Sequence, residues 1–392
     1  MAENRIAFVM SARFPTEKAY GVTNRESILE LLKKSYEVKV FSRPSSYMDS
    51  NFREIQNTLK PNSDSYIDRL LSNIANKGYG FTSKLAWKIG TKLVLRKNFK
   101  IIALYNPNII WTRETEIANF LIRKLPRAKV VLEIHSKQNP NRYKKILRNK
   151  EQIIFCPINI DIKNYLLTFF PKKCHIEVAS MSINPNFISS LDEVSRFVRK
   201  IHARENKVLE VGYVGKFAPG GYSKGIETLL ELAKYYQINK QNFRVNVIGG
   251  SGNELIRYKI QKNNMEITDR FIQISGHIPY YKVPEIMKRM DILILPNPLS
   301  QEYDGTPLKL LEYLAVGRIV MLSNALKPLE FLRYELTSNE FISGDVKDLA
   351  EKIELAINEP KLESILLAGI NYASQFTWDM RVSRIINKLK TI

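Results

Sequence analysis

The sequence has few cysteines, few acidic residues relative to basic ones, and no long apolar run. Its two cysteines, Cys156 and Cys174, show no metal-ligand spacing, so we predict a reducing compartment and no zinc site. No run approaches the ~20 apolar residues that a membrane-spanning helix needs. The apolar run near the N-terminus, R-I-A-F-V-M, is too short for a signal peptide and is typical of a first strand. The sequence therefore predicts a cytoplasmic protein.

The charge balance is strongly basic. Lys and Arg number 60 against 39 Asp and Glu, which gives a net charge of +21 at pH 7. Such an excess favours an anionic partner such as a nucleic acid, an anionic lipid surface or a phosphorylated substrate. A generally basic proteome is the alternative explanation. The sequence shows no RNA-binding motif with interleaved aromatic residues, so we expect no nucleic-acid partner.

Short apolar runs alternate with helix-like segments along most of the chain. The predicted strands are residues 5–10, 36–41, 109–112, 129–135, 152–157, 174–179, 208–215, 243–250, 271–276, 291–296 and 318–323. Because these runs are nearly continuous in apolar residues, we expect strands covered on both faces, as in parallel sheets of βα units. Helices are predicted between them, for example at residues 26–32, 225–235, 283–290 and 308–316. The predicted fold class is α/β.

The length of 392 residues exceeds that of a usual single domain, which predicts two domains. The strand pattern stops between residues 184 and 207, where a polar, charged stretch predicts a linker, and it resumes at Val208. We therefore predict Rossmann-like doubly wound domains at residues 1–190 and 205–378. Ligands of open α/β sheets bind outside the carboxyl ends of the strands, so both domains are expected to face one cleft.

Two lysines accompany glycine turns at the start of the second domain. Gly215 and Lys216 follow a predicted strand, and Lys224 and Gly225 open the next helix. The helix start offers free N–H groups and the lysines add positive charge, which suits a diphosphate. Two solvated lysines in a glycine loop are the alternative. The next strand ends in V-I-G-G-S-G, which is not a dinucleotide-binding fingerprint.

The stretch D-G-T-P-L-K-L-L-E-Y-L-A-V-G places two carboxylates, Asp304 and Glu312, around a turn that precedes a helix. Asp304 as a helix N-cap and Glu312 as a salt-bridge residue are the simple explanations. Gly305 and Thr306 leave backbone N–H groups available for an anion at the helix start.

Taken in order, G-K…K-G, V-I-G-G, S-G-H-I, L-P-N-P and this last stretch resemble the donor-binding domain of the retaining GT-B glycosyltransferases of family 4, the glycosyl transferases group 1 type. The family's E-x7-E motif corresponds to Asp304 and Glu312. In the first half, F-P-T-E-K-A-Y-G-V-T-N resembles a glycine-bearing acceptor loop, and V-V-L-E-I-H resembles a strand that ends in a sugar-contacting histidine. S-Q-F-T-W-D-M-R resembles the segment before a last helix that packs back on the first domain, here residues 379–392.

The resemblance implies a role for each matching residue. Glu312 is expected to accept two ribose hydroxyls, and Asp304 to hold hydroxyls of the transferred sugar. Lys216 and Lys224 are expected to neutralise the departing diphosphate, and His135 to contact the sugar from the opposite domain. The implied donor-binding residues are Gly21, Gly215, Lys216, Lys224, Gly249, Ile278, Asp304, Gly305, Thr306, Leu308 and Glu312, and the implied catalytic residues are His135, Asp304, Lys216 and Lys224.

The implied reaction needs no covalent nucleophile, because the leaving phosphate takes the acceptor's proton on the same face of the sugar. It needs no metal and no cofactor beyond the nucleotide-sugar donor. Asp304 is shorter than the family's glutamate, Lys216 replaces an arginine, and Tyr20 replaces the first glycine of a pair, which leaves the identity of the donor open. Glu133 is expected on the opposite strand face from His135 and receives no role. The remaining histidines, at positions 175, 202 and 277, are interpreted as structural.

Residues 84–100 carry six basic residues and no acid. Lys84, Lys88, Lys92, Arg96 and Lys100 recur every four positions, beside an apolar stripe of Leu85, Ile89 and Leu93. As a helix this is a basic amphipathic surface suited to anionic lipid headgroups. An ordinary helix that packs on the core with a solvated back is the alternative. Residues 141–150 add five more basic residues.

These patterns predict a retaining glycosyltransferase that moves a sugar from a nucleotide-activated donor to a glycan or lipid-linked acceptor. The expected setting is cell-surface polysaccharide or glycolipid synthesis, with peripheral association with the inner face of an anionic membrane. Another GT-B enzyme, such as a nucleotide-sugar epimerase or a phosphorylase, is the alternative function.

Overall fold

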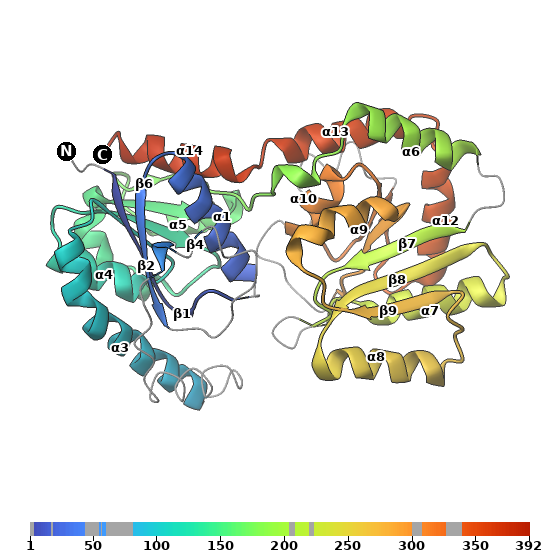
Figure 1. The fold of residues 1–392 in the computed structure, drawn as a ribbon, viewed down its shortest axis with the longest axis horizontal. Coiled ribbons are helices and arrows are strands. Elements are labelled where there is room, and N and C mark those ends of the chain that lie inside the picture. Colours follow the sequence, from blue (N-terminus) through green and yellow to red (C-terminus); the bar gives the residue numbers. More distant parts are fainter. Residues whose placement is uncertain are drawn as a thin grey trace. The chain divides into compact units, whose positions relative to one another are not determined.

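The computed structural model describes residues 4–16, 19–43, 55, 57–59, 81–203, 208–218, 223–299, 308–326 and 339–392. The chain forms two compact units (Figure 1). Unit 1 contains Met1–Ser180 and the C-terminal segment Trp378–Ile392, and unit 2 contains Met181–Thr377. Each unit is an α/β structure around a parallel sheet of six strands. This confirms the predicted fold class.

The sheet of unit 1 has the strand order β2-β1-β3-β4-β5-β6. Its strands are β1 (Arg5–Arg13), β2 (Glu37–Arg43), β3 (Ile109–Thr112), β4 (Lys129–Ile134), β5 (Ile153–Pro157) and β6 (His175–Ile176). Among its described residues, the α-helices of unit 1 are α1 (Ala19–Lys33), α3 (Phe81–Tyr105), α4 (Thr115–Lys124), α5 (Ile160–Leu167) and α14 (Trp378–Leu389). The predicted strand at residues 174–179 is therefore reduced to the two residues of β6.

The strands of unit 1 are buried on both faces, which explains their continuous apolar runs. Alternate residues of β1 enter two different hydrophobic cores, because successive side chains of a strand point to opposite faces. Ala7 and Val9 pack in the core that α3, α4 and α5 cover. Ile6 and Phe8 pack in the other core, which α1 and α14 cover. The C-terminal helix thus packs on unit 1, next to α1 (Figure 1).

The sheet of unit 2 has the strand order β12-β11-β10-β7-β8-β9. Its strands are β7 (Leu209–Val214), β8 (Phe243–Gly250), β9 (Ile272–Gly276), β10 (Ile292–Leu295), β11 (Ile319–Ser323) and β12 (Glu340–Phe341). Its helices are α6 (Leu191–Ala203), α7 (Ile226–Ile238), α8 (Gly252–Asn264), α9 (Val283–Arg289), α10 (Leu308–Ala315), α12 (Val346–Ile357) and α13 (Leu362–Ser374). The short strand β12 is an addition to the predicted strands.

The polar stretch that was predicted as a linker is helix α6, and this prediction was wrong. Val194, Phe197 and Ile201 lie on one face of α6 and are buried in the core of unit 2. Val198 is also buried, and most of the other positions are polar, as expected for an amphipathic helix on the surface of a domain. Ser190 and Glu193 form a reciprocal capping box, in which the backbone N–H of each donates to the side chain of the other. The chain passes from unit 1 to unit 2 earlier, between Ser180 and Met181.

Residues 84–100 lie within helix α3, as predicted. Leu95, Asn98 and Ile102 are buried and form the inward face of the helix. Lys92, Arg96 and Lys100 are exposed, which agrees with a basic outer face. Ile89 is also exposed rather than buried. The side chains of Lys84, Leu85, Lys88 and Leu93 lie outside the described residues. Within the described residues of the whole chain, no helix has the length and apolarity that a membrane span requires.

Candidate functional site

In unit 2 the strand order reverses between β7 and β10. The strand that follows β7 is its neighbour β8, whereas the strand that follows β10 is β11 on the other side. Ligands of open α/β sheets bind at such a switch point, outside the carboxyl ends of the strands. Most of the predicted donor-binding residues lie in the loops and helix starts at this edge.

Glycines allow the loops at this edge to touch one another. The N–H of Gly215 donates to the carbonyl of Ile248 at 2.8 Å. A Cβ on Gly249, whose φ is +120°, would lie 2.3 Å from the carbonyl oxygen of Gly215. A Cβ on Gly225, with φ of +80°, would lie 1.7 Å from the carbonyl oxygen of Pro296. Only glycine fits these positions, so the ends of β7, β8 and β10 and the start of α7 meet in backbone contact.

The two predicted phosphate-binding lysines belong to one loop. Lys216 comes two residues after β7, and the N–H of Lys224 donates to the carbonyl of Phe217 at 2.9 Å. Both lysines are partly exposed. Ser223 organises the start of α7, because its hydroxyl accepts from the N–H of Gly225 at 3.1 Å and bonds Glu227 at 2.8 Å. The structure therefore places both lysines in the loop that leads from β7 to α7.

Glu312 is a buried carboxylate in α10, with its side chain 1 % exposed. The ammonium of Lys309 lies 2.7 Å from Glu312 Oε2, and the hydroxyl of Tyr280 lies 3.3 Å from Oε1. The structure thus contains a salt bridge of Glu312, which is the simple explanation for this residue. The same pair lies at the candidate site, because the Cε of Lys309 would be 3.3 Å from a Cβ on Gly215. Sequence reasoning missed Lys309, although its spacing of three residues from Glu312 places both on one helix face.

For the other predicted residues of unit 2, the structure shows either packing contacts alone or no described position. Leu308 is the first residue of α10 and packs partly against the core. Ile278 also packs against the core, two residues before Tyr280. Asp304, Gly305 and Thr306 lie outside the described residues. In the part of the chain that the structure describes, no three or more His, Cys, Asp or Glu side chains are grouped to hold a metal ion.

In unit 1 the strand order reverses between β1 and β3. At the carboxyl ends of these strands, the backbone N–H of Ser11 donates to Glu114 Oε1 at 2.6 Å, and its hydroxyl bonds Oε2. Burial raises the pKa of Glu114, against the effect of these bonds. Gly21 lies in the first turn of α1 rather than in a loop, and a Cβ there would be 2.2 Å from the carbonyl oxygen of Thr16. Packing against the preceding loop is therefore a sufficient reason for this glycine.

His135 follows β4, next to the switch point of unit 1, and its Nε2 lies 2.8 Å from Glu133 Oε2. The expectation that Glu133 points to the opposite face was wrong. Side chains two positions apart share a face of a strand, so Glu133 and His135 meet. An acid in the apolar run V-V-L-E-I-H was the signal for this contact, because a buried charge needs partners.

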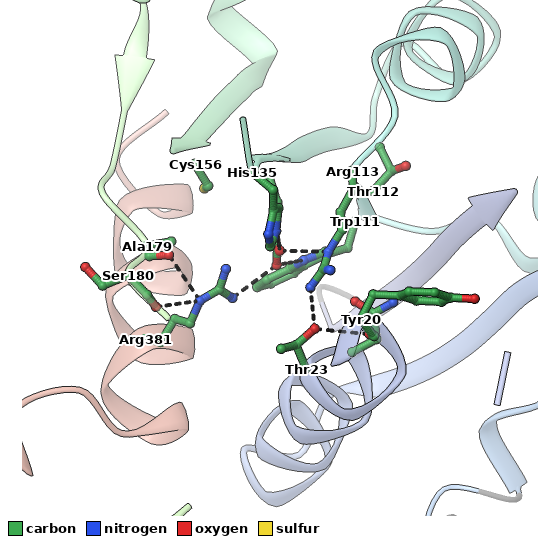
Figure 2. Close-up of polar contacts among 12 residues, drawn as sticks. Tyr20, Thr23, Trp111, Thr112, Arg113, His135, Cys156, Ala179, Ser180 and Arg381 are labelled. Atoms are coloured by element: carbon green, nitrogen blue, oxygen red, sulfur yellow. Dashed lines mark hydrogen bonds and ion pairs between the residues drawn. The ribbon is translucent and has the colours of Figure 1, made fainter. Parts of the chain in front are cut away.

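Glu133 is fully buried and receives donors on both carboxylate oxygens. Trp111 Nε1 and Arg381 Nη1 donate to Oε1 at 2.8 and 3.1 Å, and Arg113 Nε donates to Oε2 at 3.1 Å. Figure 2 shows Arg113 and Arg381 approaching from opposite sides, with His135 between them. Burial alone would raise the pKa of Glu133, but the charges of Arg381 and Arg113 hold it well below its ordinary value. Glu133 is therefore an ionised, fully paired carboxylate.

The ring of His135 is neutral at physiological pH. Burial and the positive charge of Arg113 lower the pKa of His135 to about 4, against the opposite effect of Glu133. A carboxylate only accepts hydrogen bonds, so Nε2 carries the proton of the neutral ring and donates it to Glu133. Nδ1 is then an acceptor.

Comparisons with known proteins identify a family for the second part of the chain and the fold of the whole chain. Residues 194–367 match the family model described as glycosyl transferases group 1. This match contains β7 to β12, the loop that carries Lys216 and Lys224, and helix α10 with Glu312. It confirms the resemblance that the motifs of the second half predict. No curated protein sequence matches the chain.

Solved structures with the same fold match nearly the whole chain. Sucrose-phosphate synthase from Thermosynechococcus elongatus has a TM-score of 0.69 at 16% identity, with 99% of each chain covered. A glycosyltransferase from Rickettsia africae has a TM-score of 0.67 at 16% identity, covering 99% of this chain and 98% of the other. HepE from Anabaena, solved in complex with UDP, has a TM-score of 0.66 at 12% identity, covering 99% and 100%. At these identities the similarities establish the fold, which is GT-B.

Proposed function

We propose that this GT-B chain, whose second unit carries a glycosyl transferases group 1 domain, is a retaining glycosyltransferase that uses a nucleotide-activated sugar. The observation that supports the proposal is the backbone contact between the loop of Lys216 and Lys224, the start of α7 and the ends of β8 and β10, with Lys309 lying between Gly215 and the buried Glu312. A diphosphate needs positive charge and N–H donors, and a ribose needs an acceptor for its hydroxyls. This edge of the sheet supplies both kinds of group.

The proposed donor is a uridine diphosphate sugar. HepE from Anabaena was solved with UDP and with UDP-glucose, and a trehalose-6-phosphate protein from E. coli was solved with UDP-2-fluoro glucose. These proteins share the fold of this chain along nearly its full length. The ribose is common to all nucleotide donors, so Glu312 serves any of them, and UDP is the base that the similar structures favour.

In the proposed reaction, the bond between the sugar and the diphosphate breaks while negative charge grows on the leaving phosphate. Lys216, Lys224 and the N–H groups at the start of α7 stabilise this charge where it develops. The leaving phosphate accepts the proton of the acceptor hydroxyl, and the new bond forms on the same face of the sugar. Donor activation by lysines and helix N-termini proceeds without a metal ion. Asp304 is proposed to hold the hydroxyls of the transferred sugar.

The proposed acceptor is a glycan or a lipid-linked sugar of cell-surface polysaccharide or glycolipid synthesis. Support comes from α3, where Lys92, Arg96 and Lys100 are exposed together with the apolar residues Ile89 and Leu104. A surface with exposed cations and exposed apolar side chains binds anionic bilayers at their interface. We propose that this surface docks the cytoplasmic enzyme reversibly on the inner face of a membrane.

A thermal-shift screen with UDP, GDP and ADP and their sugars tests the donor proposal. We expect UDP and UDP-sugars to raise the unfolding temperature, because ligand binding to the native state stabilises it. A turnover assay with a UDP-sugar should release UDP, and NMR of the product should show the anomeric configuration of the donor retained. An inverted product would contradict the retaining reaction. Interconversion of nucleotide sugars without an acceptor would indicate an epimerase instead.

A further inference from the structure

We propose that Glu133, held by Arg113 and Arg381, is a positioning residue that fixes the ring of His135 so that Nδ1 accepts a hydrogen bond from a sugar hydroxyl of the substrate. The substrate contact rests on the proposed function. The fixed state of the ring rests only on unit 1. Glu133 does not touch substrate, because its side chain is fully buried.

The first step concerns the two nitrogens of the ring. Nε2 lies 2.8 Å from a carboxylate oxygen that accepts from it. Nδ1 has no hydrogen-bond partner among the described residues. It is also not one of the described side-chain atoms that are both buried and unpartnered. The side chain of His135 is 28 % exposed, so Nδ1 is accessible. The hydrogen bond between Nε2 and Glu133 therefore sets the tautomer of the ring, and Nδ1 remains available as an acceptor.

The second step concerns the number of donors on Glu133. A carboxylate has about four acceptor positions, and four groups fill them: Trp111, Arg381, Arg113 and His135. Because every position is occupied, Glu133 cannot turn away from His135 without breaking bonds to buried cations. The ring therefore cannot exchange its two tautomers freely.

The third step concerns the origin of the donors. Arg381 comes from α14, and its Nε also donates to the carbonyls of Ala179 and Ser180 at 3.3 and 3.1 Å. Arg113 follows β3, and its Nη2 donates to the hydroxyl of Thr23 in α1 at 2.8 Å. Each arginine is thus anchored at a second point, on a different element. The carboxylate is held in place by the fold of unit 1 rather than by one local turn.

The fourth step concerns charge. The groups that face the ring are Glu133 on β4, Arg113 after β3, Arg381 on α14 and Cys156 on the neighbouring strand β5. Burial raises the pKa of Cys156, so its thiol is neutral and adds no charge. Two arginines and one carboxylate leave one net positive charge beside the ring, which disfavours an imidazolium. A neutral ring offers Nδ1 as an acceptor for a hydrogen-bond donor, and the hydroxyl is the donor that a sugar carries.

The test is an NMR titration of the full chain with ¹⁵N-labelled histidine. The sequence contains four histidines, and the loss of one set of signals in His135→Gln assigns the ring. We expect a neutral ring with the proton on Nε2 from pH 8 down to pH 5, and a pKa of about 4. A proton on Nδ1 at pH 7, or a pKa near the ordinary 6.5, would overturn the proposal.

Two pairs of variants separate positioning from a merely structural role. Arg113→Met should raise the pKa of His135, because it removes the cation that lowers it, whereas Arg113→Lys should leave it low. Glu133→Asp keeps the charge but shortens the reach, so both tautomers should appear, and kcat should fall by ~10-fold or more, the scale of losing an orienting partner. An unchanged tautomer and kcat in Glu133→Asp would contradict the role of Glu133. Should that variant not fold, the parent spectrum and the Arg113 pair still decide the outcome.

A last arm distinguishes this proposal from the proposed function. The UDP-sugar with the largest thermal shift is added to the labelled parent, and UDP alone serves as the control. We expect the Nδ1 signal to move with the UDP-sugar and not with UDP. A sugar that binds and is turned over without moving Nδ1 would refute the hydroxyl contact while the proposed function stands. Failure of every nucleotide sugar to bind would refute both the proposed function and the contact.

Discussion

In unit 2 the two predicted phosphate-binding lysines come from one loop between β7 and α7, at the carboxyl edge of the sheet, and both are partly exposed. In unit 1 the corresponding edge is backed by a fully buried carboxylate with two arginines, one of which is 248 residues away. Partly exposed cations beside a helix start suit a ligand that brings its own negative charge. A buried, paired carboxylate suits the precise orientation of one neutral ring. The comparison separates an edge that we propose binds charge from an edge that we propose fixes geometry.

The largest expected effect is on the charge-binding side. Lys216→Ala and Lys224→Ala should each lower kcat by ~10²-fold or more, the scale of removing one group that stabilises developing charge. Turnover of a UDP-sugar measures this. Lys259→Ala, an exposed lysine in α8, is the matched control and should keep the parent rate. Parent-like rates in the double variant at positions 216 and 224 would show that these lysines are solvated bystanders.

The next largest effect is on the geometry-fixing side, and it concerns stability. Arg381→Met should destabilise unit 1 by about 3–5 kcal/mol, the cost of removing one partner from a buried ion pair. Chemical denaturation followed by far-UV circular dichroism measures the free energy of unfolding. Arg384→Met, an exposed arginine of the same helix, should change it by less than about 0.5 kcal/mol. Equal effects of the two substitutions would argue against a buried network.

The same network predicts how stability depends on pH. The pKa of His135 is about 4 in the folded chain against an ordinary 6.5, so the unfolded chain binds more protons between these values. Stability should therefore fall as pH falls from 6.5 to 4, by on the order of 2 kcal/mol from this residue. The pKa of Glu133 is lowered in the folded chain. Protonation of Glu133 therefore adds a further loss of stability as pH falls through this lowered pKa. His135→Gln should flatten the upper part of this dependence, and an equally steep curve would contradict the assignment.

A smaller effect is expected for the ribose acceptor of unit 2. Glu312→Ala should weaken UDP binding by about 1.5–3 kcal/mol, the range for hydrogen bonds to a charged group, which is roughly 10- to 100-fold in Kd. Calorimetric titration with UDP measures the change. Glu312→Gln keeps the shape and removes the charge, and it should bind more weakly than the parent. An Ala variant that binds UDP as tightly as the parent would leave Glu312 as a salt-bridge residue only.

The smallest expected effect per residue is the loss of membrane-binding free energy when charges on the surface of α3 are reversed. Each Lys or Arg near an anionic bilayer contributes about 1 kcal/mol, so reversal of Lys92, Arg96 and Lys100 to Glu should abolish co-sedimentation with anionic vesicles. Binding of the parent should fall with salt, because exposed charges are screened over ~8 Å at physiological ionic strength. Turnover with a soluble acceptor should persist.

A matched control for the surface variant reverses three exposed lysines of unit 2. Lys240, Lys259 and Lys347 are exposed, and their reversal changes the net charge by the same amount. This control should still bind anionic vesicles. Equal loss of binding in both variants would indicate a general charge effect rather than docking by α3.

The sequence predicted most of the fold because buried parallel strands are continuous apolar runs. The linker prediction failed because the polar face of α6 dominates its composition, although Ser190 and Glu193 carry a capping-box signature. In the candidate site, Lys216, Lys224 and Glu312 could be proposed from the sequence because glycine turns and helix starts are local signals. Arg113 and Arg381 were missed because their meeting at Glu133 depends on contacts between distant segments. The contact of Glu133 with His135 could have been predicted from the sequence, because alternation along a strand places both side chains on one face.

The central claim is that the carboxyl edge of unit 2 binds the nucleotide diphosphate. Hydrogen–deuterium exchange of the full chain with and without UDP tests this most directly. We predict protection of backbone N–H groups at residues 215–218, 223–228 and 308–312, because UDP covers the loop after β7 and the starts of α7 and α10. No protection at these residues in the presence of saturating UDP, with protection elsewhere in the chain, would contradict the claim.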